Sequence, residues 1–272
     1  MPMNEPPALP RKILPIIYVI DTSGSMAYDR IGAVNEAMYA SVDVMKDIAD
    51  KNPDAEIKIG ILTFASGAEW VTKDGYGKPS LIYMEDFFWN DLSAGGLTDI
   101  GEALKELHDK MSRSSFFSEE VGYKMPVIIF MSDGEPTDDW EGALNKILAN
   151  NKWFDNSTRI CLAVGADANK EKLTRIAGNS EAVIEVTDTD TLKKLIKVVS
   201  ATVSKIGSKS RTDDDAQREI IKQLGQGMEG EPGVVIEEPK SDPNEDPTPG
   251  GSPDPVDPGE GWGTGWDDGW DD

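Results

Sequence analysis

The chain has 272 residues, a formal net charge of −23 at pH 7 and a hydrophobic fraction of 38%. This length suits one sizeable domain with an additional segment, or two small domains. A negative charge of this size argues against nucleic acid and anionic membrane surfaces as partners. The acidity is concentrated at the end of the chain, because residues 228–272 contain fourteen acidic residues and one lysine, Lys240.

The cysteine count and the hydropathy exclude several classes of protein. Cys161 is the only cysteine, so neither an internal disulfide nor a cysteine-based zinc site can form. Its apolar neighbours predict a buried side chain rather than a reactive thiol. Residues 1–12 lack the apolar core of a secretory signal, and the longest apolar run, of eight residues, is too short to cross a bilayer. We therefore expect a cytoplasmic protein.

Apolar runs and helical patterns alternate from residue 13 onwards. Segments rich in isoleucine and valine predict buried strands at 13–20, 56–65, 126–131, 159–165 and 182–186. Between them we expect helices at 30–51, 98–111, 139–150, 169–178 and 189–205. Residues 68–92 contain turn signals and predict an antiparallel hairpin or edge strand. This order indicates an α/β fold, with an open, doubly wound, mostly parallel sheet, one antiparallel edge strand and helices on both faces, as in Rossmann-like folds.

The composition divides the chain into four parts. We expect a disordered N-terminal segment at 1–11, a folded domain at 12–206, a linker able to form one short helix at 207–227, and a disordered acidic tail at 228–272. The tail ends in three Gly-Trp-x-x units, at Trp262, Trp266 and Trp270. Tryptophan is typical of binding hot spots, so these units are candidate contacts for a partner. The carboxylates of the tail are also candidate ligands for a metal site on the domain.

Hydroxyl and carboxyl side chains follow the predicted strands at the edge where α/β sheets bind ligands. Asp21, Ser23 and Ser25 follow the first strand, Asp133 follows the third, and Thr98 stands at the start of the second predicted helix. Together they form an oxygen-only donor set, which suits Mg²⁺ or Mn²⁺ better than zinc or copper. Because only two of the donors are carboxylates, the donor set would not over-neutralise a divalent metal, and an open coordination position would attract an anionic oxygen from a partner.

Each of these residues also has an interpretation without a metal. Asp21 with Ser23, and Asp133 with the glycine that follows it, are compatible with ordinary turns. Thr98 is compatible with a helix N-cap, a role that does not exclude metal binding. The neighbouring acids are more typical of helix starts or solvated loops than of metal ligands: Asp99, Asp138 and Asp139.

The order of the five candidate residues resembles the metal-ion-dependent adhesion site of the von Willebrand factor A (vWA) family. The matching elements are D-x-S-x-S at 21–25, a threonine behind two glycines and an aspartate in Ser-Asp-Gly, and the resemblance covers about residues 12–206. It implies a vWA domain in which Mg²⁺ or Mn²⁺ is bound directly by Ser23, Ser25 and Thr98, and directly or through water by Asp21 and Asp133.

The same resemblance implies a protein partner that supplies an acidic residue to the metal. The segment at 132–140 further resembles TerY-like proteins of bacterial tellurium-resistance operons. That narrower resemblance implies a role in stress response or signalling, with a Ser/Thr kinase and a PP2C-type phosphatase as partners.

Three functions remain open at this point. The favoured one is a metal-dependent protein-interaction module; the alternatives are a metal-dependent hydrolase or ATPase accessory subunit, and a metal-buffering stress protein. The one histidine, His108, lies between acidic residues in a predicted helix, and the chain contains neither G-x-x-x-x-G-K-[ST] nor G-x-G-x-x-G. We therefore predict that the chain is not an enzyme.

Overall fold

The computed structural model describes residues 10–133, 135–206 and 213–236. These residues belong to one compact unit, Met1–Pro239. Residues 1–9 and 237–272, which hold most of the two predicted disordered segments and all three tail tryptophans, lie outside the described residues. No helix in the described part of the chain is long and apolar enough to cross a membrane.

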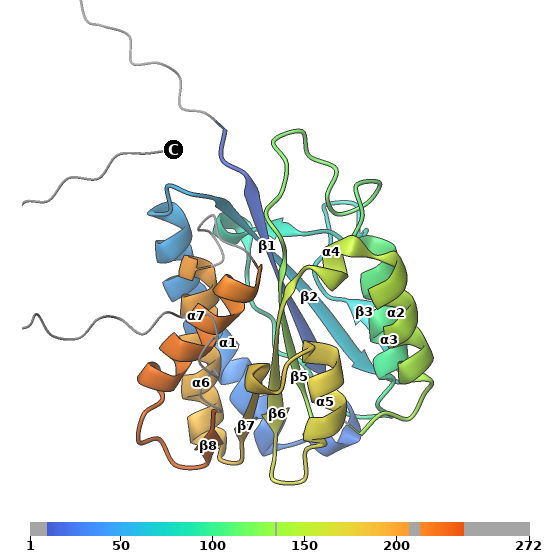
Figure 1. Ribbon diagram of the computed structural model, residues 1–272, viewed down its shortest axis with the longest axis vertical. Coiled ribbons are helices and arrows are strands. Elements are labelled where there is room, and N and C mark those ends of the chain that lie inside the picture. Colours follow the sequence, from blue (N-terminus) through green and yellow to red (C-terminus); the bar gives the residue numbers. More distant parts are fainter. Residues whose placement is uncertain (1–9, 134, 207–212, 237–272) are drawn as a thin grey trace, which may run out of the picture. The chain divides into compact units, whose positions relative to one another are not determined.

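A mixed sheet with a parallel centre forms the middle layer (Figure 1). Five parallel strands lie in the order β2-β1-β5-β6-β7, with bounds Glu56–Ala65, Ile13–Asp21, Val127–Ser132, Thr158–Val164 and Val183–Val186. On one edge, β3 (Gly67–Trp70) and β4 (Ile82–Tyr83) both pair antiparallel with β2. On the other edge, β8 (Val234–Val235) pairs antiparallel with β7. The predicted fold class and the antiparallel edge near 68–92 are confirmed.

Helices cover both faces of the sheet, as the predicted doubly wound topology requires. One face carries α1 (Asp29–Asp50), α6 (Thr189–Ile206) and α7 (Asp213–Gly227). The other carries α2 (Ile100–Lys110), α3 (Trp140–Asn150), α4 (Lys152–Asp155) and α5 (Lys170–Ala177). Three short 3-10 helices are η1 (Gly24–Met26), η2 (Met84–Asp86) and η3 (Ser180–Ala182).

Two apolar cores, one on each side of the sheet, hold these layers together. Successive side chains of a strand point to opposite faces. In β1, Ile16 and Tyr18 therefore pack beneath α1 and α6, whereas Ile17 and Val19 pack beneath α2 and α3. Cys161 in β6 is fully buried, as predicted, and burial raises the pKa of its thiol to about 12. The thiol is therefore a packing group at neutral pH.

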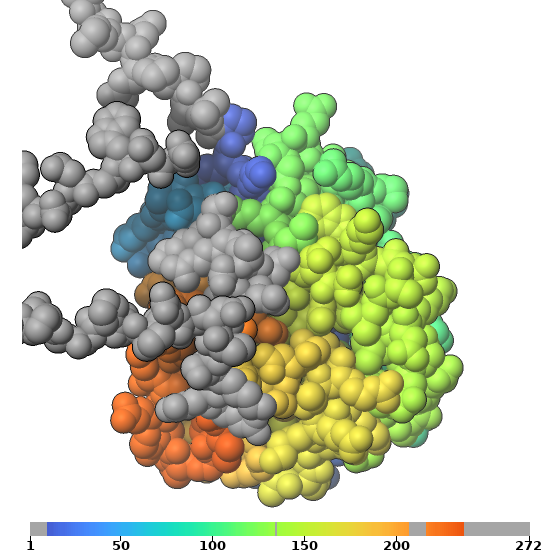
Figure 2. All heavy atoms as spheres, in the orientation of Figure 1, coloured from blue at the N-terminus to red at the C-terminus, as the bar shows by residue number. Residues whose placement is uncertain are grey.

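The C-terminal part of the described chain differs from the sequence prediction. A helix was expected within the linker at 207–227, but α7 is also part of the packed unit, because Ile220, Ile221 and Leu224 are fully buried. Figure 2 shows the orange surface of α7 against the yellow surface of the region that contains η3. The strand β8 and the buried Met228 fall within the segment predicted as tail. The packed unit therefore extends beyond residue 206, at least to the end of β8.

Candidate metal site

The ends of two neighbouring strands place two carboxylates side by side. The parallel strands β1 and β5 pair with Ile20 opposite Met131, so Asp21 and Asp133 leave the sheet at the same edge. Asp21 is completely buried and Asp133 is 4% exposed. Buried carboxylates are costly unless they are paired, hydrogen-bonded or bound to a cation. This edge of the sheet is therefore a candidate binding site.

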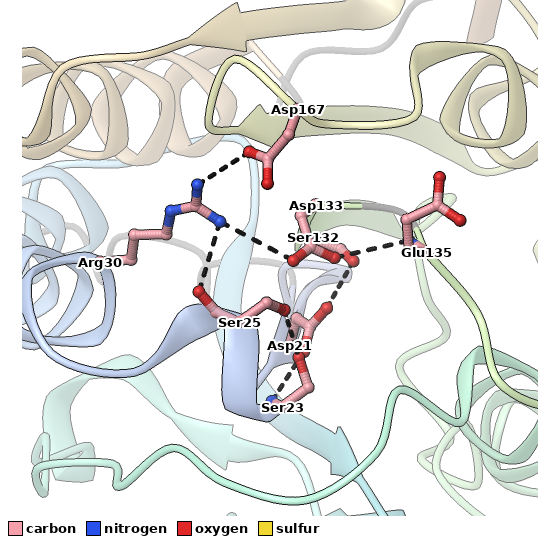
Figure 3. Close-up of polar contacts among 8 residues, drawn as sticks. All are labelled: Asp21, Ser23, Ser25, Arg30, Ser132, Asp133, Glu135 and Asp167. Carbon is pink, nitrogen blue, oxygen red and sulfur yellow. Dashed lines mark hydrogen bonds and ion pairs between the residues drawn. The ribbon is translucent and has the colours of Figure 1, made fainter.

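Hydrogen bonds hold Asp21 in one orientation (Figure 3). Ser132 Oγ donates to Asp21 Oδ2 at 2.6 Å, and the backbone N–H of Ser23 donates to Oδ1 at 2.8 Å. Burial raises the pKa of Asp21; the hydrogen bonds lower it, and the negative charge of Asp133 raises it further. Ser132 is the last residue of β5 and was not among the predicted site residues. Its position next to Asp133 in the sequence was the signal that could have identified it.

The two predicted serine ligands come together next to Asp21. Ser23 Oγ and Ser25 Oγ are 3.0 Å apart, with Ser23 at the N-cap of η1 and Ser25 within it. The loop turns tightly because Gly24 N–H donates to Gly96 O at 3.1 Å, and a Cβ at Gly24 would lie 3.4 Å from that oxygen. Two hydroxyls at this separation can share one cation.

Thr98 is brought to the same loop by backbone hydrogen bonds from the preceding glycines. Gly95 N–H donates to Thr22 O at 2.7 Å, in addition to the bond between Gly24 and Gly96. Thr98 is 7% exposed, and its hydroxyl forms no hydrogen bond with any of the described residues. The helix α2 begins at Ile100, so Thr98 does not occupy the N-cap position that the sequence also allowed.

The three neighbouring acids have structural roles. Asp138 accepts hydrogen bonds from the backbone N–H groups of Gly101 and Glu102 in the first turn of α2. Asp139 caps α3 by accepting from Gly142 N–H. Asp99 occupies the N-cap position of α2 and accepts from Gly67 N–H and Thr137 Oγ1. These acids hold helix starts and loops around the site, as the interpretation without a metal predicted.

A cation that the sequence analysis missed lies beside the candidate ligands. Arg30, in the first turn of α1, places Nη1 3.8 Å from Asp133 Oδ2 and donates from the same nitrogen to Ser25 O at 3.3 Å. Its Nη2 pairs with Asp167 Oδ1 at 2.8 Å (Figure 3). Asp167 lies in the loop after β6, far from Arg30 in the sequence. An arginine shortly after D-x-S-x-S was the only signal for this contact.

The donor set fits a hard divalent cation. The loops bring three hydroxyls and two buried carboxylates to one edge of the sheet. Hard cations such as Mg²⁺ take oxygen ligands and commonly retain water. The described residues contain no group of three or more His, Cys, Asp or Glu side chains that could hold a metal. Any metal at this edge would therefore depend on the serine and threonine hydroxyls.

Comparison with known proteins agrees with this architecture. A family model for the von Willebrand factor type A domain matches residues 16–198. The collagen alpha-6(VI) chain of Homo sapiens is 30% identical over 207 residues, which cover 71% of this chain and 8% of the collagen chain. The Mus musculus protein of the same name is 29% identical over 199 residues, with the same coverage of 71% and 8%. The chain thus spans a small fraction of the length of these relatives.

Solved structures with low sequence identity share the fold. A von Willebrand factor type A protein from Catenulispora acidiphila has a TM-score of 0.50 at 20% identity, covering 72% of this chain and 43% of that one. Proximal thread matrix protein 1 from the mussel byssus, with a zinc-occupied MIDAS motif, has a TM-score of 0.50 at 19% identity and covers 70% and 47%. The pilus adhesin SpaC from Lactobacillus rhamnosus GG has a TM-score of 0.52 at 14% identity and covers 78% and 30%.

The family model covers about two thirds of the sequence, and it spans the strand–loop elements that carry Asp21, Thr98 and Asp133. The Catenulispora acidiphila structure shares the fold of this chain at a TM-score of 0.50. The chain therefore belongs to the von Willebrand factor type A domain family.

Proposed function

We propose that this domain binds one divalent metal ion, Mg²⁺ or Mn²⁺, at the edge described above. Ser23, Ser25 and Thr98 would hold the ion directly, and Asp21 and Asp133 would do so directly or through water. The observation that carries this proposal is the pair of serine hydroxyls 3.0 Å apart, one of them on the residue whose backbone N–H donates to the fully buried Asp21 carboxylate. The zinc-occupied MIDAS motif of the mussel protein supports a metal at the corresponding place.

We further propose that the metal-bound domain is a protein-interaction module. When bound, the ion would supply a Lewis-acidic position that accepts a carboxylate oxygen from a partner. The protein's own residues orient the site: Ser132 fixes Asp21, and the glycine loop fixes Thr98. Hydroxyl ligands add no charge, so two carboxylates do not over-neutralise a divalent ion, and the site retains attraction for an anion.

The broader biological setting rests on the sequence. A cytoplasmic component of stress signalling, similar to TerY-like proteins and acting with a Ser/Thr kinase and a PP2C-type phosphatase, remains our more specific proposal. Its support is the segment at 132–140, in which Ser132 and Asp133 belong to the site and Asp138 and Asp139 cap helices. The proposed role requires no catalytic residue. His108 lies on α2, next to Asp109, outside the proposed ligand set.

Affinity capture with the full-length chain tests the interaction directly. Wild type, Asp21→Ala and a matched control, Asp109→Ala, would be used as bait in Mg²⁺ and in EDTA. Asp109 is a suitable control because its side chain is 71% exposed on α2 and contacts His108 rather than the site. We expect a partner that is retained by wild type and by the control in Mg²⁺, and lost in EDTA and with Asp21→Ala. A partner retained under all conditions would place binding on another surface.

A further inference from the structure

Arg30 connects the candidate metal site with the loop that follows β6. Its guanidinium contacts Ser25 O, the buried carboxylate of Asp133 and the exposed carboxylate of Asp167 (Figure 3). Two of these three residues are proposed to lie at the metal. A fixed positive charge therefore stands among groups that would hold a divalent cation.

The backbone at Gly165 passes close to the ion pair of Arg30 and Asp167. Gly165, at the end of β6, has φ +102°, and a Cβ there would lie 2.4 Å from Arg30 Nη2 and 2.6 Å from Asp167 Oδ1. The backbone of Gly165 is held in the sheet, because its N–H donates to Val186 O at 2.8 Å. The backbone thus passes directly beside the ion pair. A side chain at this position would be strained by the positive φ and would have to displace the ends of the Arg30 and Asp167 side chains. The arginine side chain is 26% exposed and so is only partly screened by solvent.

The charges at this edge decide what the site binds. Asp21 and Asp133 supply two buried negative charges, and Arg30 offsets one of them. A divalent ion at the serine hydroxyls would be repelled by Arg30. Its charge would exceed the remaining buried negative charge, and the exposed carboxylate of Asp167 would balance the difference. Metal affinity is therefore lowered, and the attraction of the metal-bound site for a carboxylate is raised.

We propose that Arg30 sets the charge of the metal site: it weakens metal binding by the domain alone and thereby makes stable metal occupancy depend on the carboxylate supplied by a partner. This inference rests on the proposed function and adds its regulation. By linkage, metal and partner then strengthen each other's binding. Asp167 moderates the effect, because it partly neutralises Arg30 and draws its Nη2 away from Asp133.

A purely structural role for Arg30 predicts the opposite result. If the guanidinium only held the loops in place, its removal would loosen Ser25 and Asp133 and weaken metal binding. If its charge matters, removal strengthens metal binding. Its contacts with the candidate ligands are long, at 3.3 and 3.8 Å, so we expect the charge to dominate. The sign of the change therefore separates the two interpretations.

Mn²⁺ binding to the full chain, followed by electron paramagnetic resonance at low ionic strength, measures this sign. Relative to wild type, Arg30→Gln should bind Mn²⁺ about tenfold more tightly, the order of magnitude that Coulomb's law gives for one charge near a divalent ion. Arg30→Lys keeps the charge and should remain within about twofold. Asp167→Asn should weaken binding several-fold. These differences should shrink as salt is raised.

Lys51→Gln is the matched control, because it removes one positive charge just beyond the far end of the same helix, about 30 Å from Arg30. It should leave Mn²⁺ affinity unchanged. Equal or weaker binding by Arg30→Gln, with wild-type binding intact and sensitive to Asp21→Ala, would overturn this inference alone. Mn²⁺ binding by neither wild type nor Arg30→Gln would overturn the proposed function and this inference with it.

Discussion

The two ends of the parallel sheet both hold charged side chains, but the protein partners of these side chains differ. At the C-terminal end, Asp133 is 4% exposed, and within the described residues its carboxylate contacts a backbone N–H at 3.4 Å and Arg30 at 3.8 Å. At the N-terminal end, the half-buried Arg159 in β6 donates to backbone carbonyls of Ile176, Phe154 and Asp155. The carboxylate therefore has long contacts with the described residues, whereas the guanidinium makes three hydrogen bonds.

The helix ends explain the hydrogen bonds of Arg159. Ile176 lies in the last turn of α5, and Phe154 and Asp155 end α4, so Arg159 lies where helix carbonyls are free and the helix dipole is negative. The guanidinium also lies over the Phe154 ring, 5.0 Å from its centre. A polar cavity of about 550 Å³ adjoins this residue, with Gln217 and Arg218 of α7 in its wall. Although a cavity adjoins Arg159, its contacts with the helix ends account for its position without a bound ligand.

The difference in protein partners indicates which charged side chains a bound ligand would stabilise. Arg159 is held by the fold, because it donates three hydrogen bonds to backbone carbonyls at the ends of α4 and α5. Asp21 imposes a desolvation cost that its hydrogen bonds offset only in part. A bound cation would remove that cost. Mutations at the two ends should therefore separate binding from stability.

The largest expected effect is the loss of metal binding at the C-terminal end. Replacing both serines, Ser23→Ala with Ser25→Ala, removes two proposed ligands while the Asp21 carboxylate keeps its hydrogen bond from Ser132. Mn²⁺ affinity should fall about 100-fold or more. Isothermal titration calorimetry measures the affinity, and circular dichroism confirms the fold. Unchanged affinity in a folded double variant would remove these hydroxyls from the site.

At the N-terminal end, the expected effect is on stability. Arg159→Ala removes three hydrogen bonds to helix-end carbonyls, each worth about 1 kcal/mol, and should lower the free energy of unfolding by about 3 kcal/mol. Mn²⁺ affinity should not change. Chemical denaturation provides the measurement, with Arg175→Ala as the control, because Arg175 forms an exposed ion pair with Glu141 that is worth about 0–1 kcal/mol. Equal losses in the two variants would mean that the buried contacts of Arg159 contribute little.

A smaller effect concerns the cost of burying Asp21. Burial raises the pKa of this carboxyl, so the folded metal-free protein binds a proton here more tightly than the unfolded chain does. The cost is present above the raised pKa and is relieved as the pH falls through it. Asp21→Asn should therefore be more stable than wild type at pH 7 in EDTA, by about 1–3 kcal/mol.

The advantage of Asp21→Asn should shrink as the pH falls towards 3.8, the ordinary value for this carboxyl. Thermal unfolding across this pH range measures the difference between the two proteins. A constant difference, or a less stable asparagine variant at pH 7, would show that the hydrogen bonds to Asp21 outweigh its desolvation.

Local sequence patterns predicted the fold class and the parallel strands. Continuous apolar runs located the parallel strands because strands covered on both faces need no polar alternation. The topology of such a sheet then brought Asp21 and Asp133 to one edge. Whether the five predicted residues bind metal remains a prediction, but the structure places their loops together. Thr98 illustrates the limit, because the sequence left its N-cap role open and only the start of α2 at Ile100 excludes it.

Contacts between distant segments escaped prediction. Arg30 and Asp167 are 137 residues apart, and no periodicity relates them. Ser132 directly follows the strand predicted at 126–131, and nothing in the local sequence indicates its partner. Only the parallel pairing of β1 and β5 places it next to Asp21. The packing of α7 was missed because its apolar residues are few, although Ile220, Ile221 and Leu224 all face the interior.

Anomalous X-ray scattering from crystals grown in Mn²⁺ is the most direct test of whether one divalent ion binds at the serine hydroxyls. We expect a single strong peak per chain, in contact with Ser23 Oγ, Ser25 Oγ and Thr98 Oγ1, that disappears in Asp21→Ala. A wild-type crystal with no peak there, or with manganese bound only to carboxylates elsewhere in the chain, would contradict it.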